Sequence, residues 1–101
     1  MKIAVSSKGK DENSMVSELS GRCPYYLLFE DGKLLKAISN LFRFGGGAGF
    51  AVAEMLSDEG VGLVISGSFG ANMVSTLGEK GIKHKEIKGM TVKEALKKVI
   101  E

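Results

Sequence analysis

The spacing of apolar residues along the chain predicts three strands that do not belong to a hairpin. Residues 2–6 and 61–65 are short apolar runs, typical of central strands that helices cover on both faces. Residues 82–87 are rich in charge, which favours the edge of a sheet, where lysine discourages pairing with other chains.

A hairpin is predicted between the first two of these strands. Residues 25–30 are aromatic and aliphatic, and the Asp-Gly pair at residues 31–32 favours a tight turn. The return strand then covers residues 33–40, with Leu34 and Ile38 pointing to one face and a more polar set pointing to the other.

Two helices are predicted where apolar residues recur at helical spacing. The first helix follows a glycine-rich stretch and stops at Gly60. Its apolar face consists of Ala48, Ala51, Val52, Met55 and Leu56. The second helix stops at Gly81. Its inward residues are Ala71, Val74 and Leu77.

A third helix and two loops complete the chain. The capping box Thr91-x-x-Glu94 opens the third helix. Its apolar face is Val92, Ala95, Leu96, Val99 and Ile100. Residues 7–14 are polar, which predicts a surface loop. Residues 16–24 show no regular spacing of apolar residues, and Pro24 disfavours a helix at the residue before it, so we predict an irregular connector.

The order βββαβαβα predicts one α/β domain over residues 1–101. We expect a ribonuclease-H-like, three-layer α/β/α architecture with a mixed five-stranded sheet, in which strand 2 is antiparallel. Such sheets bind ligands beyond the carboxyl ends of their parallel strands. The loops at residues 6–8 and 67–70 and the glycine-rich stretch should therefore meet at one rim.

Composition narrows the classes of function. A net charge of +2, with lysines spread along the chain, argues against a nucleic-acid partner. No apolar run reaches membrane-spanning length, and the first residues enter a strand rather than a signal peptide. A single cysteine excludes an internal disulfide, and we expect a cytoplasmic protein.

The glycine-rich stretch before the first helix is the first candidate for a binding site. Gly45, Gly46, Gly47 and Gly49 place bare backbone N–H groups at a positive helix end, which an anion or cluster can approach. The alternative is a flexible loop that permits close packing. The stretch lacks the Lys-Ser/Thr of a phosphate-binding P-loop and the setting of a dinucleotide fingerprint.

Three side chains are candidates for chemistry at the site. Cys23 follows an arginine that favours the thiolate, but a lone cysteine is more commonly a core residue. Arg22 is available to an anionic ligand, or forms a surface ion pair. His84 has no second histidine to share a metal, which favours an ordinary strand histidine.

Catalysis is not predicted. The first strand carries Ala4, Val5 and Ser6, and therefore lacks the acidic residue with which a ribonuclease-H-type nuclease holds metal ions. With one histidine, on a charged edge strand, no Ser-His-Asp or Cys-His arrangement can be assembled. We expect a binding protein.

An ordered set of motifs resembles the dinitrogenase iron–molybdenum cofactor biosynthesis family, which includes NifX-like and NifB C-terminal-like domains. The motifs span nearly the whole chain: residues 1–5, 16–26, 46–56, 60–72, 81–82 and 91–96. The resemblance implies the ribonuclease-H-like fold and a non-catalytic accessory protein. Such a protein binds or carries iron–sulfur or iron–molybdenum cofactor precursors and works with iron–sulfur assembly proteins.

The loops expected at the rim, taken together with the resemblance, give the candidate cofactor-binding residues. They are Ser6, Gly21, Arg22, Cys23, Gly45, Gly46, Gly47, Gly49, Gly67, Ser68, Gly70 and Asn72. Family members often carry histidines before the Gly-Arg pair and in the glycine loop; this chain has Leu19-Ser20 and Gly47 there, which leaves Cys23 as the implied metal ligand. A binding module for a small anionic metabolite and a protein–protein adaptor remain alternatives at the same rim.

Overall fold

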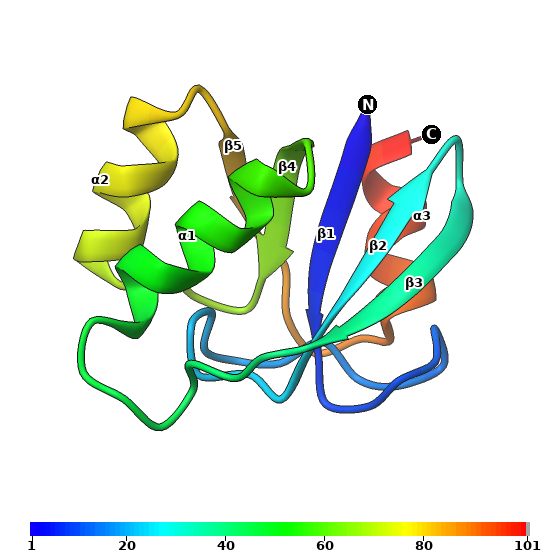
Figure 1. Cartoon of the computed structure of the whole chain (residues 1–101). Coiled ribbons are helices and arrows are strands. Elements are labelled where there is room, and N and C mark those ends of the chain that lie inside the picture. Colours follow the sequence, from blue (N-terminus) through cyan, green and yellow to red (C-terminus); the bar gives the residue numbers. More distant parts are fainter. Residues whose placement is uncertain (101) are drawn as a thin grey trace.

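The computed structural model describes residues 1–100 and shows a sheet with helices on both faces (Figure 1). The elements in chain order are β1 (Lys2–Ser7), β2 (Tyr25–Glu30), β3 (Lys33–Ser39), α1 (Ala48–Asp58), β4 (Val61–Ser66), α2 (Ala71–Glu79), β5 (Lys83–Glu86) and α3 (Val92–Ile100). The predicted order of strands and helices is confirmed.

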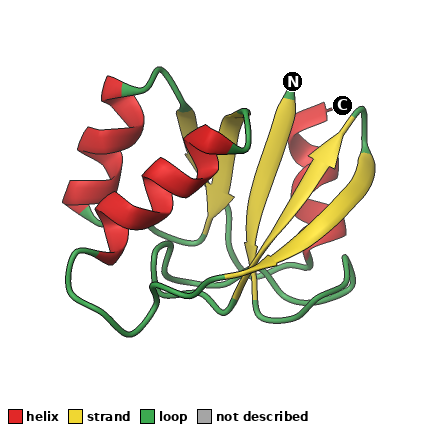
Figure 2. Ribbon diagram, in the orientation of Figure 1, coloured by secondary structure: helices red, strands yellow, loops and turns green. Residues whose placement is uncertain are grey.

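The sheet is mixed, with the strands in the order β3-β2-β1-β4-β5 (Figure 2). β2 is antiparallel to both of its neighbours, whereas β4 is parallel to β1 and to β5. The predicted five-stranded α/β sheet with an antiparallel second strand is therefore confirmed. The parallel strands β1 and β4 both point to the lower end of the molecule in Figure 1, where the longest loops gather.

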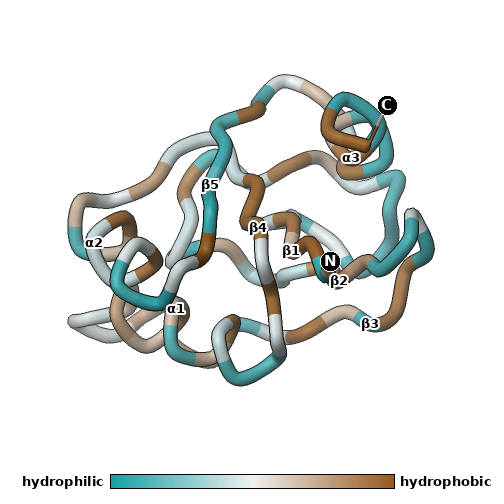
Figure 3. Tube along the Cα trace, turned by 90° about the horizontal axis from the view of Figure 1, so that it is seen from above, coloured by the Kyte–Doolittle hydropathy of each residue, from teal (hydrophilic) through white to brown (hydrophobic). Residues whose placement is uncertain are grey.

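The core consists of two apolar layers, one on each face of the sheet. Figure 3 shows α1 and α2 on one side of the strands and α3 on the other. Successive side chains of a strand point to opposite faces, so each central strand contributes to both layers. α1 and α2 pack against one layer, which contains Ala4, Tyr26, Leu28, Val64, Val52 and Leu56. α3 packs against the other, which contains Val5, Leu27, Phe29, Ile65, Val92 and Leu96.

Several predicted helix and turn signals are confirmed by backbone geometry. Gly60 and Gly81 follow α1 and α2 with φ of 79° and 72°, the left-handed conformation that suits a helix end. Ahead of α3, the Glu94 N–H donates to the Thr91 hydroxyl (3.2 Å), and the Glu94 carboxylate accepts from the Thr91 N–H (3.0 Å).

The predicted facing of β3 is wrong. Ile38 lies opposite Tyr26, and Leu34 lies opposite Phe29. Directly opposed residues share a face, and Tyr26 and Phe29 belong to different core layers. Leu34 and Ile38 therefore point to opposite faces, because Leu35 is an extra residue that forms a β-bulge between them.

The predicted inward face of α2 is only partly correct. Leu77 is buried as expected, but Ala71 is exposed and Val74 is half-buried, while Met73 and Thr76 are buried instead. The first turn of α2 packs closely against α1, which turns Met73 inward. Ser7 also departs from the prediction, because it is the buried last residue of β1 rather than part of a surface loop.

Within residues 1–100, no helix has the length and apolar character to cross a bilayer.

Candidate functional site

A pocket of about 280 Å³ opens at the end of the sheet where β4 leads into α2. Three segments form it: the connector before β2, the start of α1 and the start of α2. Its lining residues are Leu19, Ser20, Gly21, Arg22, Gly47, Ala48, Gly49, Gly70, Ala71, Asn72 and Met73. We call it the glycine pocket.

Two helix N-termini meet at the glycine pocket. α1 begins after Gly47 (φ 72°) and α2 after the extended Gly70, and no side chain caps either helix. The first N–H groups of a helix have no partner within it, and the helix dipole adds partial positive charge there. Neither first turn holds an acidic residue, so this positive end is not neutralised locally.

Glycine is required where the three segments touch. A Cβ on Gly49 would lie 3.1 Å from the Met73 backbone nitrogen, so a side chain there would separate the two helix starts. Gly21 has a φ of 92° and lies next to Gly49. Close backbone approach therefore explains Gly49, and the positive φ explains Gly21.

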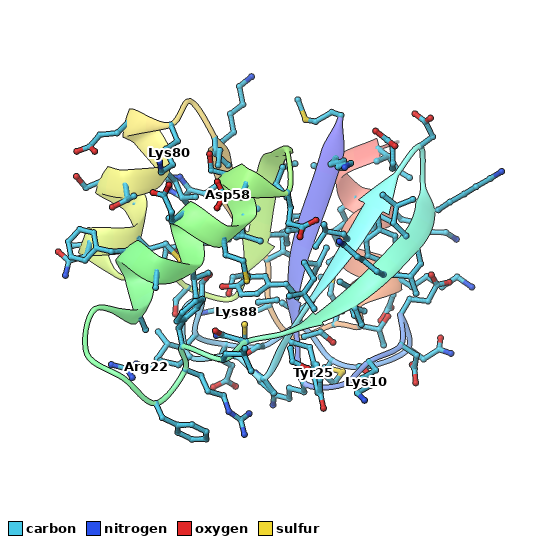
Figure 4. All side chains as sticks on the ribbon, in the orientation of Figure 1. Lys10, Arg22, Tyr25, Asp58, Lys80 and Lys88 are labelled. Carbon is cyan, nitrogen blue, oxygen red and sulfur yellow. The ribbon has the colours of Figure 1, made fainter. Side chains whose placement is uncertain are left out.

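Arg22 is the only charged side chain in the pocket lining. Its Nη1 donates hydrogen bonds to the carbonyls of Arg43 (2.8 Å) and Gly45 (3.0 Å). Figure 4 shows Arg22 beside the loop that leads into α1. Two of the five guanidinium N–H groups hold the loop, which leaves the others to meet an anion in the pocket.

The connector that forms one wall of the pocket is held by buried hydroxyl groups. The Ser6 hydroxyl donates to the Ser66 hydroxyl (2.7 Å), and the Ser66 hydroxyl donates in turn to the Ser17 carbonyl (3.3 Å). A Cβ on Gly67 would lie 2.7 Å from the Glu18 Cα, so the loop after β4 lies directly against the connector. The Ser68 hydroxyl donates to the Glu18 carbonyl at 2.6 Å.

A second set of hydrogen bonds fixes the connector beneath the pocket. The Tyr26 hydroxyl is hydrogen-bonded to the Ser20 hydroxyl (2.7 Å) and accepts a hydrogen bond from the Gly21 N–H (2.9 Å). Asn40, also buried, donates to the carbonyls of Gly21 and Cys23, both at 2.9 Å. Tyr26 and Asn40 thus position the wall without lining the pocket.

Cys23 is buried beside these groups, with 1% of its surface exposed. Burial raises the pKa of its thiol from 9.0 to about 11, although hydrogen bonds from Tyr26 and backbone amides act in the opposite direction. The thiol is therefore protonated at neutral pH, whereas metal ligation needs the thiolate.

Of the residues expected at the rim, half are found in the lining of the glycine pocket. They are Gly21, Arg22, Gly47, Gly49, Gly70 and Asn72. Gly45 and Gly46 lie on the loop ahead of α1, outside the pocket lining. Ser6, Gly67 and Ser68 support the connector. Cys23 is enclosed beneath the connector. The expected loop at residues 6–8 does not reach the pocket, and the connector takes its place.

The pocket also contains residues that the sequence analysis did not single out. They are Leu19, Ser20, Ala48, Ala71 and Met73. Ala48, Ala71 and Met73 flank predicted glycines at the two helix starts, so extending the prediction to each first helical turn would have found them. Leu19 and Ser20 carry no such signal, because only the fold of the connector brings them there.

The donor groups fit an anion held by hydrogen bonds better than a coordinated metal. Within residues 1–100, no group of three or more His, Cys, Asp or Glu side chains could hold a metal ion. His84 lies on β5, with its ring centroid 4.9 Å from that of Phe69. Positive backbone ends and Arg22 suit a ligand that brings negative charge and its own coordination shell.

Comparison with known proteins gives a consistent result. The sequence matches the family described as dinitrogenase iron-molybdenum cofactor over residues 1–101. A NifB-like protein from Thermotoga, solved by NMR, is 31% identical with a TM-score of 0.84; the match covers 97% of this chain and 85% of that one. No curated protein was found to match.

Two other solved structures share the fold at lower identity. The apo form of the orange protein from Desulfovibrio gigas is 24% identical with a TM-score of 0.90, over 98% of this chain and 86% of that one. A Methanocaldococcus jannaschii protein described as a dinitrogenase is 18% identical with a TM-score of 0.63, over 95% and 84%. With the family match along its whole length, the chain belongs to the dinitrogenase iron-molybdenum cofactor family.

Proposed function

We propose that this protein is a non-catalytic carrier that binds an anionic iron–sulfur or iron–molybdenum type cofactor precursor in the glycine pocket. The precursor is cargo, held by backbone N–H groups and Arg22 and not by side-chain ligands to its metals. The single observation that carries this proposal is the meeting of two uncapped helix N-termini and Arg22 in a pocket whose lining has no carboxylate.

The physical basis is charge complementarity at close range. The starts of α1 and α2 both line the glycine pocket with first-turn N–H groups that no side chain caps, and the Arg22 guanidinium adds a full positive charge. Hydrogen bonds to charged groups contribute roughly 1.5–3 kcal/mol each, about twice the neutral value. A cluster with exposed sulfides or oxyanions would receive several at once.

Anaerobic reconstitution with iron and sulfide, followed by desalting, absorption spectra and metal analysis, tests the proposal. Arg22→Ala should reduce retained iron about tenfold or more, as expected for one charge-assisted hydrogen bond. Ala71→Asp should have a similar effect, because it places a carboxylate in the pocket. Arg43→Ala is the matched control, since Arg43 lies on the loop that Arg22 holds but outside the glycine pocket, and this variant should load as the wild type does.

Cys23→Ala separates hydrogen bonding from coordination. We expect this variant to retain iron, because the thiol is buried and protonated. Loss of iron from Cys23→Ala together with full loading of Arg22→Ala would contradict this mode of binding and favour a thiolate ligand.

A second candidate ligand is a small anionic metabolite, since a helix N-terminus also suits phosphate and carboxylate groups. Thermal shift with phosphate, nucleotides and carboxylates distinguishes the two, because a ligand that binds only the folded state raises the melting temperature. A shift with one of these anions that Arg22→Ala abolishes, without retention of iron, would favour the metabolite.

We further infer the finer features that accompany a carrier. The strand order β3-β2-β1-β4-β5 with a reversed β2 supports a ribonuclease-H-like architecture. The single buried free cysteine supports a cytoplasmic location, where thiols stay reduced. Iron–sulfur assembly proteins are the proposed partners, because a carrier must receive its cargo and pass it on.

A further inference from the structure

A second concave surface lies between α1 and the edge strand β3. It has a volume of about 580 Å³, twice that of the glycine pocket. Its lining residues are Ile38, Ser39, Leu41, Phe42, Ala51, Glu54, Met55, Asp58 and Glu59. We call it the α1–β3 groove. It shares no lining residue with the glycine pocket, so the two are separate surfaces.

The floor of the α1–β3 groove is apolar and is exposed where the chain leaves β3. Ile38 and Met55 are partly buried and pack against the core layer below α1. Leu41 is 84% exposed and Phe42 41% exposed. Adjoining apolar side chains that remain in water beside a polar rim are typical of a protein-interaction surface.

The wall formed by α1 and its C-cap residue is lined by carboxylates. Glu54, Asp58 and Glu59 line it in succession. Lys80 pairs with Glu54 and Lys36 with Glu59, each at 2.8 Å. Exposed ion pairs are weak, so these lysines could exchange for cations of a partner.

Asp58 is the carboxylate of this wall that has no cationic partner. It forms no ion pair within residues 1–100, whereas Glu54 and Glu59 do; Figure 4 labels Asp58 and Lys80, whose ammonium pairs with Glu54. Lys2 also lies at this end of α1, but its Nζ donates to the backbone carbonyl of Glu59 (3.1 Å) and not to a carboxylate. A partner with basic side chains therefore complements this wall.

The edge of β3 is protected against pairing with an added strand, so a binding partner does not extend the sheet there. Leu35 forms a bulge that interrupts the ladder, and Lys33 and Lys36 stand on either side of it. Bulges and lysines are the usual protection of an edge against pairing with another strand. The groove beside that edge is instead bounded by a helix, as in helix-in-groove recognition.

We propose that the α1–β3 groove docks an amphipathic, basic helix of a partner protein. The apolar face of that helix lies on Ile38, Leu41, Phe42 and Met55, and its lysines or arginines face the carboxylates of α1. An exposed apolar floor beside a wall of carboxylates favours a basic amphipathic helix over an acidic or purely polar segment.

A designed amphipathic peptide of leucine and lysine with helical spacing is the probe. Its fluorescence anisotropy should rise saturably with the wild-type protein, whereas the counterpart with glutamate in place of lysine should not bind. Leu41→Ser and Asp58→Lys should each weaken binding several-fold, and together about tenfold or more.

Matched substitutions elsewhere serve as controls. Ile100→Ser removes an apolar side chain that is 51% exposed on the other face of the sheet, and Glu79→Lys makes the same charge change on α2. Both should bind the peptide as the wild type does. Circular dichroism and urea unfolding of the groove variants show that they are folded.

Three results would overturn the proposal. Equal binding of the lysine and glutamate peptides would remove the role of the α1 carboxylates. Unchanged affinity in Leu41→Ser with Asp58→Lys would place the peptide elsewhere. Concentration-dependent dimerisation in sedimentation, abolished by Leu41→Ser, would make a second copy of this chain the occupant.

Discussion

The hydroxyl of Tyr26 is the residue-scale feature on which the wall of the glycine pocket depends. It satisfies the buried Ser20 hydroxyl and the buried Gly21 N–H at 2.7 and 2.9 Å. Tyr26→Phe would leave that N–H unsatisfied, and we expect a loss of roughly 1–3 kcal/mol in the free energy of unfolding. Urea unfolding measures it.

The neighbouring tyrosine provides the control. Tyr25 is half-buried and its hydroxyl makes no hydrogen bond among the described residues. Tyr25→Phe should change stability by less than about 0.5 kcal/mol. Equal effects of the two substitutions would show that the Tyr26 hydroxyl does not hold the connector.

The thiol of Cys23 predicts a specific dependence of stability on pH. Its pKa rises from 9.0 to about 11 on folding. Between these values the unfolded chain loses the thiol proton and the folded chain keeps it, so stability falls as pH rises. The fall is at most about 1.4 kcal/mol per pH unit.

Lysines titrate in the same range, so the measurement is a difference between two proteins. Urea unfolding of the wild type and Cys23→Ala at about pH 8 and about pH 10.5, below and above the titration of the thiol in the unfolded chain, gives the two stabilities. The advantage of the wild type should shrink at the higher pH. A gap that stays constant would mean that the thiol titrates normally in the folded protein.

At the scale of elements, the packing of the loop after β4 against the connector gives a paired prediction. The Gly67 Cβ position lies 2.7 Å from a backbone atom of Glu18, whereas that of Gly78, on the exposed side of α2, meets nothing within 4 Å. Gly67→Ala should therefore lower stability by roughly 1–3 kcal/mol through overpacking. Gly78→Ala should raise it by roughly 0.5–1 kcal/mol through helix propensity.

Thermal unfolding of both variants checks the pair. A stabilising Gly67→Ala would show that the connector moves away from β4 easily, and the proposed rigidity of the pocket wall would then be wrong.

Local sequence signals predicted the helices and strands well, because each element has its own spacing of apolar residues or its own terminating residue. The Asp-Gly turn, the glycines after α1 and α2 and the Thr91–Glu94 box act within a few residues and need no knowledge of the fold. The facing of β3 could not be predicted, since the bulge at Leu35 depends on pairing with β2. The burial of Met73 depends similarly on the contact between α1 and α2.

At the scale of the whole molecule, burial predicts how hydrogen exchange is distributed. β1 lies between β2 and β4, and Ile3 to Ser7 are all buried. Its amides should exchange slowest, near the rate set by global unfolding, whereas those of residues 41–47 should exchange fastest, because this loop is largely exposed. Exchange in β1 as fast as in that loop would show that the sheet opens independently of global unfolding.

The candidate site shows the limit of reasoning from sequence at this scale. Glycines at the two helix starts were predicted as a rim because topology brings the ends of parallel strands together. Ser6 and Gly67 were assigned to the same rim, but they hold the connector, whose path follows from contacts between distant residues. The burial of Cys23 has the same origin, since nothing local distinguishes a buried from an exposed lone cysteine.

The hairpin turn, residue 1 and the end of α3 all lie at the end of the sheet away from the glycine pocket. Figure 1 marks both N and C at this end, and Met1, Gly32 and Ile100 line a cavity of about 480 Å³ there. The two ends of the sheet therefore differ, with a place for attachment at one end and ligand entry at the other. A tether attached to residue 1 or to the end of α3 would leave the glycine pocket open to solution.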